Sequence, residues 1–451
     1  MASAAPGPSG KDAIRFLLPG LRRDPLSMLT GLTNRYGDLV RVPLPRGGQV
    51  LIVSRPDLVA HVLVGNQANY GKARTYKPLT ELLGNGLLTN EGDDWARQRK
   101  LVQPMFARRH IDAFAPAMVD AADQATRKWA DGTTIDVAGE MSALTLDVVG
   151  RALFSADLTG EASAMGPALA TVLEAFIKVV RNPLFMLVPD YHRWPTPNRL
   201  RARGAEAHLR TVVDGLVARR RAQPEHPGAE DLLDMLLAAR DESTGAPMAE
   251  QQIRDELMTF MLAGHETTAN ALAWTLMLLS QHPDARACLE AEVDEVLSGR
   301  PATAEDTGKL EWTAAVLSES MRLYPPAWII EREAAGADEL DGVRVPAGSV
   351  VATPPYLVHR NPDHWPNPEG FEPERFLGDT ARERHRFAYL PFGGGRRQCV
   401  GGGFAMLEAV LLLATISRHF RLDLVPGYRP DPTPTVTLRP AGAIPMRLHA
   451  R

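Results

Sequence analysis

The stretch FGGGRRQCVGGGFAMLE, residues 392–408, decides the fold of this chain. Its single cysteine, Cys399, lies between two glycine clusters, and an apolar run with helical periodicity follows over residues 404–416. A thiol at the beginning of a helix meets the positive end of the helix dipole and free backbone N–H groups, and both favour the thiolate. The glycines at 393–395 carry no Cβ, so the backbone there can bend sharply and approach a flat, bulky group. The stretch predicts a thiolate presented to such a group, with a buried structural cysteine as the alternative.

A thiolate held in this way suits an axial ligand of haem iron, because sulfur donates electron density to the metal. The stretch resembles the haem-binding signature of the cytochromes P450, whose fixed positions are all present: Phe392, Gly395, Arg397, Cys399, Gly401, Phe404, Ala405 and Glu408. The resemblance extends over about residues 20–448, with further motifs at family-like spacings. It implies that Cys399 binds the iron of haem b (iron protoporphyrin IX), and that Phe392 contacts the cofactor.

Length and composition predict one domain in a reducing compartment. The chain has 451 residues, a net charge of −4 and two cysteines, Cys288 and Cys399, which cannot form a disulfide framework. Residues 1–12 are rich in small residues and predict a disordered lead, so a single domain is expected over residues 13–451. No run of about 20 apolar residues occurs. We expect a cytoplasmic, soluble monomer of bacterial type with no membrane anchor, and the charge gives no argument for nucleic-acid binding.

The pattern along the chain is mainly helical with small sheets (α+β). Asp24-Pro25 predicts a capped helix that ends near Gly37, and residues 39–42 and 50–53 predict a hairpin. Helical periodicity dominates residues 93–300, whereas residues 329–357 and 422–448 contain short β-like runs, and a proline-rich meander spans 360–391. By resemblance this is the cytochrome P450 fold, with haem between a long central helix and the helix after the cysteine loop.

That central helix is predicted over residues 253–281, with Phe260, Ala263, Gly264 and Thr267 among the residues of one stripe. Small residues let a flat ligand approach the helix axis, and Glu266 and two threonines are unusual at the centre of an apolar helix. Threonine hydroxyls that bond to the preceding turn are the alternative. By resemblance, Ala263 faces the haem, Thr267 hydrogen-bonds dioxygen and an ordered water, and Glu266 relays protons. His265 is expected to face elsewhere.

Several cations are expected around the haem carboxylates. Trp95 and Arg99 are four residues apart and share one helix face, and the indole N–H and the guanidinium can both donate to a carboxylate. The alternative is a partly buried tryptophan beside solvated arginines. By resemblance, Trp95, Arg99, Arg332 and Arg397 contact the propionates, and His359 is a further candidate.

Glu319 and Arg322 are three residues apart on a predicted helix, and the sequence PERF at residues 373–376 follows. An isolated pair of this kind is common on protein surfaces. In the family the glutamate and arginine pair with the later arginine, Arg375 here, in a buried network that holds the meander beneath the haem.

The remaining predictions concern ligands of the pocket and of the surface. A hydrophobic substrate pocket is expected from Leu87, Leu88, Phe176, Leu262, Ala263, Trp328, Ile329 and Val436, with Ala327 and Thr435 nearby. A basic patch for an acidic ferredoxin or flavodoxin is expected from Arg97, Lys100, Arg108, Arg109, Arg396 and Arg418, with ordinary solvated arginines as the alternative.

Together these patterns and the resemblance to the cytochromes P450 imply a haem-thiolate monooxygenase. It would hydroxylate or epoxidise a hydrophobic small molecule, such as a terpenoid, fatty acyl or polyketide compound, using O2 and electrons from NAD(P)H through a ferredoxin or flavodoxin and its reductase. Three alternatives remain: a peroxide-dependent or non-oxygenase relative, a haem-based gas sensor or carrier, and a helical scaffold without haem.

Overall fold

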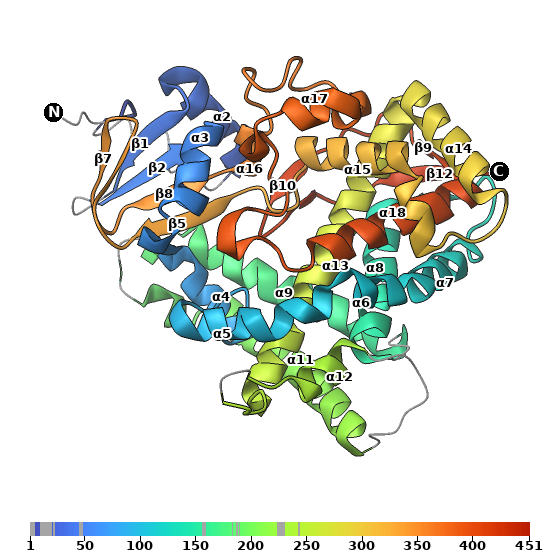
Figure 1. The fold of residues 1–451 in the computed structure, drawn as a ribbon, viewed down its shortest axis with the longest axis horizontal. Coiled ribbons are helices and arrows are strands. Elements are labelled where there is room, and N and C mark those ends of the chain that lie inside the picture. The colour runs from blue at the N-terminus through green and yellow to red at the C-terminus, as the bar shows by residue number, and fades with distance from the viewer. Residues whose placement is uncertain are drawn as a thin grey trace.

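The computed structural model describes all residues except 1–4, 10–19, 21–22, 45–47, 156–158, 183, 186–187, 189, 223–230 and 242–243. A helix-rich body surrounds the long helix α13, and a smaller β-rich part lies to one side (Figure 1). The helices are α2 (Pro25–Tyr36), α3 (Pro56–Ala60), α4 (Lys77–Leu83), α5 (Gly92–Val102), α6 (Arg108–Ala113), α7 (Ala115–Thr126), α8 (Val137–Phe154), α9 (Thr159–Val180), α11 (Pro197–Ala222), α12 (Leu232–Ala238), α13 (Glu250–Gln281), α14 (Pro283–Leu297), α15 (Glu311–Leu323), α16 (Pro355–Val358), α17 (Gly378–Glu383) and α18 (Gly402–His419).

The strands form small sheets, as the short β-like runs predict. One sheet has the order β1-β2-β8-β5-β3, a second has the order β4-β12-β9, and β6–β7 and β10–β11 form hairpins. Their bounds are β1 (Leu39–Pro43), β2 (Gln49–Val53), β3 (Tyr70–Lys72), β4 (Thr134–Asp136), β5 (Ile330–Ala334), β6 (Asp338–Leu340), β7 (Val343–Val345), β8 (Val350–Thr353), β9 (Phe420–Leu424), β10 (Pro432–Pro434), β11 (Leu438–Pro440) and β12 (Pro445–Ala450).

The N-terminal predictions are confirmed where the structure describes them. Asp24 caps α2 by accepting from the Ser27 N–H, and β1 pairs antiparallel with β2. Most of the predicted lead lies outside the described residues. Within residues 5–9, Ala5 is buried and the Pro6 carbonyl accepts from the Arg41 N–H, so this part packs against β1.

Helix α13 is the centre of the largest hydrophobic core. It is buried on nearly all sides because α8, α11, α15 and α18 pack around it. The helix ends at Gln281 because Pro283, which has no N–H to continue the ladder, begins α14. Helix α18 begins at Gly402, three residues after Cys399, and contacts α13. The cysteine loop thus leads into a helix that the core fixes in place.

Candidate active site

The cysteine loop is shaped by glycines and by backbone contacts. Gly393 and Gly395 both have φ near +69°, the left-handed region in which a side chain is strained. Gly395 also lies so close to the Leu63 carbonyl that an added Cβ would stand 1.9 Å from that oxygen. The Cys399 N–H donates to the Phe392 carbonyl at 2.9 Å, which closes the loop. These contacts fix the backbone that carries the Cys399 sulfur.

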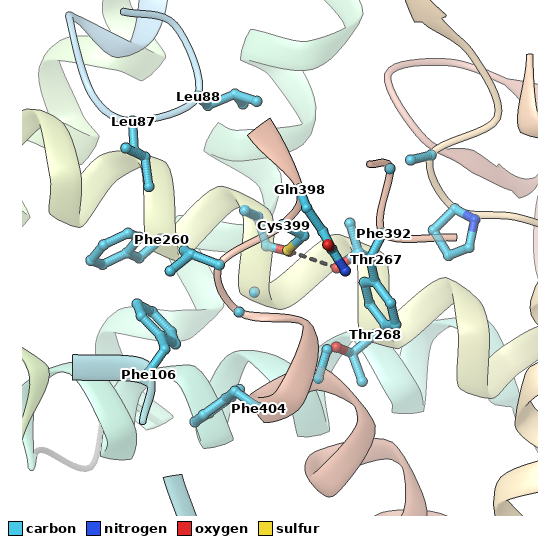
Figure 2. Close-up of a pocket in the computed structure, with 18 of the residues that line it drawn as sticks. Leu87, Leu88, Phe106, Phe260, Thr267, Thr268, Phe392, Gln398, Cys399 and Phe404 are labelled. Atoms are coloured by element: carbon cyan, nitrogen blue, oxygen red, sulfur yellow. Dashed lines mark hydrogen bonds between the residues drawn. The ribbon is translucent and has the colours of Figure 1, made fainter. Parts of the chain in front are cut away.

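Cys399 lies in the wall of a cavity of about 340 Å³, shown in Figure 2. Its thiol is exposed to this cavity and is otherwise enclosed by protein. Enclosure raises the pKa of Cys399, whereas the Gly401 backbone N–H and the Arg99 guanidinium lower it. The helix entrance therefore favours the thiolate as the sequence predicts, but burial is the larger effect. Coordination by a metal cation would supply the missing stabilisation of the anion.

The walls of the cavity are mostly apolar and come from separate parts of the chain. Figure 2 shows Leu87 and Leu88 at one side and Phe106 and Phe404 at another, with Cys399 between them. The principal apolar lining residues are Leu87, Leu88, Phe106, Val149, Ala152, Leu153, Leu232, Phe260, Ala263, Ala271, Leu317, Met321, Pro326, Ala327, Ile330, Phe392 and Phe404.

The middle of α13 contributes a small-residue surface to this cavity. Ala263, Gly264, Thr267 and Thr268 all line it, in agreement with the predicted stripe. The Thr267 hydroxyl donates to the Ala263 carbonyl at 2.6 Å, so the back-bonding considered as the alternative is present. That bond uses the hydroxyl proton and leaves the oxygen lone pairs directed outward as acceptors. Thr267 therefore packs as a helical threonine and still presents a polar atom to the cavity.

The two residues before Thr267, His265 and Glu266, turn away from the cavity. Glu266 faces the hairpin of β10 and β11, where burial raises its pKa and a hydrogen bond from Thr437 and the charge of Arg439 lower it. His265 faces α8, with Nε2 2.9 Å from the Ser142 hydroxyl, and burial lowers the pKa of this imidazole to about 4. The predicted direction of His265 is confirmed. Glu266 has no direct contact with the cavity, so its predicted relay role stays a prediction.

One margin of the cavity carries a cluster of cations. Arg99, Arg332 and Arg397 line it as predicted, and Lys72 joins them. Burial and the charges of Arg332 and Arg397 lower the pKa of Lys72. Burial also lowers the pKa of Arg397 to about 10, although its ion pair with Glu91 at 2.8 Å opposes that effect. Cations that depress one another's pKa values favour an anionic ligand.

Trp95 lines the same margin, and the Arg397 guanidinium lies 4.2 Å from the centre of its ring. Arg99 donates to the Gln398 carbonyl at 2.8 Å, which ties α5 to the cysteine loop. These residues fit haem on three independent grounds: a thiol in the wall, a mostly apolar interior for a porphyrin, and cations at one edge for its two carboxylates.

The structure places several residues that were predicted to contact haem or substrate outside the cavity lining. His359 is fully buried there, and its Nε2 accepts from the Leu390 N–H at 2.9 Å. Trp328 turns away because its indole donates to the Thr435 carbonyl at 2.8 Å. Leu262 is buried in the core beside Ala263 but about 100° around the helix from it. The others outside the lining are Phe176, Ile329, Val436 and Thr435.

The sequence reasoning missed other lining residues, among them Phe106, Leu153 and Leu232. These lie on or next to helices without a site motif, and no signal in the sequence marks them. Two omissions did have a signal. Phe260 lies on the predicted stripe, and Glu408 belongs to the quoted signature. Glu408 is fully buried, and burial raises its pKa to about 8 while the Thr268 hydroxyl opposes the shift.

The structure brings Glu319, Arg322 and Arg375 together, as predicted. Arg322 makes a bidentate pair with Glu319 at 2.7 and 2.8 Å, and both side chains are fully buried. Arg375 Nε lies 3.6 Å from the same carboxylate. Arg322 also donates to the carbonyl of His359, directly before the meander, and to the carbonyls of Pro368 and Gly370 within it. The network therefore connects α15 to the meander.

The predicted basic patch is only partly exposed. Arg97, Lys100, Arg108, Arg109 and Arg396 lie at the surface. Arg418 does not belong to it, because its side chain is mostly buried and pairs with Asp123 at 2.8 Å. Within the described part of the chain, no helix is long and apolar enough to cross a membrane.

Comparison with known proteins agrees with this geometry. The family model for Cytochrome P450 matches residues 7–444. Cyclooctatin synthase of Streptomyces melanosporofaciens is 39% identical, with 94% of this chain and 92% of the relative aligned. Pentalenene oxygenase of Streptomyces avermitilis is 34% identical over 96% of this chain and 94% of its own length. The crystal structure of the cytochrome P450DA heme domain superposes with a TM-score of 0.87 at 26% identity and covers 100% of this chain and 98% of that one. The chain belongs to the cytochrome P450 family.

Proposed function

We propose that this protein is a haem-thiolate monooxygenase that hydroxylates or epoxidises a hydrophobic small molecule of the terpenoid class. The observation that carries the proposal is the Cys399 thiol opening into an apolar cavity that Thr267 also lines. The substrate class is supported by relatives named cyclooctat-9-en-7-ol 5-monooxygenase and pentalenene oxygenase, at 38% and 34% identity.

In this proposal, different residues of the chain bind the haem and the substrate. Cys399 holds the haem iron, and Arg99, Arg332, Arg397 and Lys72 hold its carboxylates at the cavity margin. Haem, when bound, supplies the activation of dioxygen. The apolar walls exclude water and orient the substrate, and the Thr267 hydroxyl offers a hydrogen-bonding atom in an otherwise apolar surface.

Electrons would come from NAD(P)H through a separate ferredoxin or flavodoxin and its reductase. The exposed cations around α5 and the cysteine loop support this, because positive charge would steer an acidic partner to the cysteine side. Arg97 and Arg108 are paired with Asp94 and Asp112 in exposed positions, so Lys100, Arg109 and Arg396 would contribute most of the field.

The position of Glu266 favours a second candidate, a peroxide-dependent enzyme of the same family. Such an enzyme needs no proton relay from solvent to dioxygen, and Glu266 faces Thr437 rather than the cavity. The two candidates share the thiolate ligand and the apolar pocket and differ in the oxidant.

The first experiment records the spectrum of the reduced, purified protein under carbon monoxide. We expect the shifted Soret band of thiolate-bound haem, and its loss in Cys399→Ser, because a neutral hydroxyl donates less charge to iron. A nitrogen-ligand spectrum in fresh wild-type protein, or absence of haem, would refute the proposal.

The second experiment offers a panel of terpenes, fatty acids and polyketide lactones to the protein. Product formed with NADPH, a surrogate ferredoxin and its reductase, but not with hydrogen peroxide alone, supports the monooxygenase. The reverse result supports the peroxide-dependent candidate. Preference for fatty acids or lactones over terpenes would contradict the substrate class.

A further inference from the structure

The loop of residues 84–90 carries two side chains of the cavity wall, Leu87 and Leu88, and has no regular secondary structure. Its backbone lies directly on the N-terminal half of α13. An added Cβ at Gly84 would stand 2.1 Å from Asp255 Oδ1, and one at Gly86 would stand 2.2 Å from Thr259 Oγ1. The two glycines allow this contact because no side chain separates the loop from the helix.

Two consecutive carboxylates of α13 accept hydrogen bonds from the backbone of this loop. The Asn85 N–H donates to Asp255 Oδ2 at 2.8 Å, and the Leu87 N–H donates to Glu256 Oε2 at 2.9 Å. Both carboxyl groups are buried, and Glu256 is fully so. Its second oxygen, Oε1, is buried without a hydrogen-bond partner among the described residues.

A fully buried carboxyl group with one oxygen unpaired is costly, so a packing role alone does not explain it. An apolar residue of similar size would fill the same space without that cost, but it would leave the Leu87 N–H unpaired. Glu256 supplies the acceptor for the Leu87 backbone N–H. The side chain of Leu87 in turn forms part of the cavity wall. The other end of the loop is held separately, since Arg397 donates to the Asn90 carbonyl at 3.1 Å.

We propose that Glu256, with Asp255, positions the 84–90 loop so that Leu87 closes one side of the cavity, which makes Glu256 a specificity-determining residue of the substrate pocket. The part of this inference that concerns ligands rests on the proposed haem-thiolate function. The anchoring itself does not, because it involves only groups of the polypeptide.

The anchoring is tested by hydrogen exchange of the full-length protein, in wild type, Glu256→Leu and Glu256→Gln. Leucine cannot accept a hydrogen bond, so we expect the Leu87 amide to exchange roughly tenfold faster, because nothing replaces the lost acceptor. Glutamine keeps an acceptor oxygen and should restore protection. Glu250→Gln, an exposed position at the start of the same helix, is the matched control and should change nothing.

The effect on specificity is tested with imidazole and 4-phenylimidazole as probes of different bulk, by titration of the haem spectrum. We expect Glu256→Leu to change the ratio of the two dissociation constants severalfold and Glu256→Gln to restore it. An unchanged exchange rate in Glu256→Leu would overturn the anchoring. Faster exchange with an unchanged ratio would overturn the specificity role. A wild-type protein without thiolate-bound haem would instead contradict the proposed function and leave the exchange result standing.

Discussion

The buried network of Glu319, Arg322 and Arg375 gives the sharpest stability prediction, for Glu319→Gln. In the native network, Oε2 of Glu319 accepts from Arg322 Nε, and Oε1 accepts from Arg322 Nη2 and from the Glu372 N–H. Glutamine presents one oxygen and one NH2 group. Whichever way the amide is oriented, its NH2 group faces a donor, and the Arg322 guanidinium loses its charge partner.

The magnitude follows from burial. Glu319 and Arg322 are both 0% exposed, so solvent does not screen the loss. Leaving one member of a buried pair without its partner costs about 3–5 kcal/mol. A chain of 451 residues has an unfolding entropy of roughly 0.9 kcal/mol/K near its melting temperature. The melting temperature should therefore fall by about 3–5 °C.

The assay is thermal unfolding at one scan rate, followed by calorimetry and by loss of haem absorbance. The control is Glu369→Gln, which removes the same charge from an ion pair with Arg360 in which the carboxylate is 71% exposed. An exposed pair contributes at most about 1 kcal/mol, so the control should shift by about 1 °C or less. Equal shifts in the two variants would refute the reasoning, because burial would then not decide the cost.

Two further predictions concern α13. Thr267→Ala should lower the coupling, which is the fraction of electrons recovered in product, while leaving the haem content unchanged. Thr267→Ser keeps the hydroxyl and should retain the coupling. A serine variant with lowered coupling would argue against a role for the hydroxyl. Burial lowers the pKa of His265 to about 4 from an unfolded value near 6.5, so the unfolded chain binds a proton first and stability should fall as the pH drops from about 6.5 to 4. His265→Gln should flatten that fall in urea titrations, whereas Ser142→Ala should keep it, since burial is the main cause of the shift; an unchanged slope in His265→Gln would contradict this.

Much of the site was predictable because its residues lie in short motifs. The cysteine loop, the Ala263–Thr267 surface of α13 and the Glu319 network each depend on neighbours within a few positions, or on a motif that fixes the fold around them. The errors arose where the direction of a side chain around its helix decides whether it reaches the cavity. Leu262 adjoins Ala263 in sequence, yet one step along a helix rotates a side chain by about 100°. Phe260, which shares the predicted stripe with Ala263, lines the cavity, whereas Leu262 does not.

The apolar wall could not be predicted because tertiary packing assembles it. Trp328 is apolar and close to the site in sequence, but its indole N–H needs an acceptor when buried and finds the Thr435 carbonyl outside the cavity. His359 shows the same effect, because its imidazole is fully buried outside the cavity lining and its Nε2 accepts from the Leu390 N–H. A buried polar atom takes the partner that packing offers, and its sequence position does not reveal which one.

The hydrogen bonds of α13 separate the chemistry of this site from its selectivity. Small residues in the middle of the helix line the cavity into which Cys399 opens. The two halves of the helix hold other parts of the chain. Asp255 and Glu256 hold the 84–90 loop, while Trp274 donates to the Leu438 carbonyl at 3.1 Å and so holds the β10–β11 hairpin. Changes at Asp255 and Glu256 move one cavity wall without touching Cys399, whereas the hairpin held by Trp274 lies outside the lining. Variants of Asp255 and Glu256 should therefore keep the spectrum of the reduced carbon monoxide complex while their preference among ligands changes.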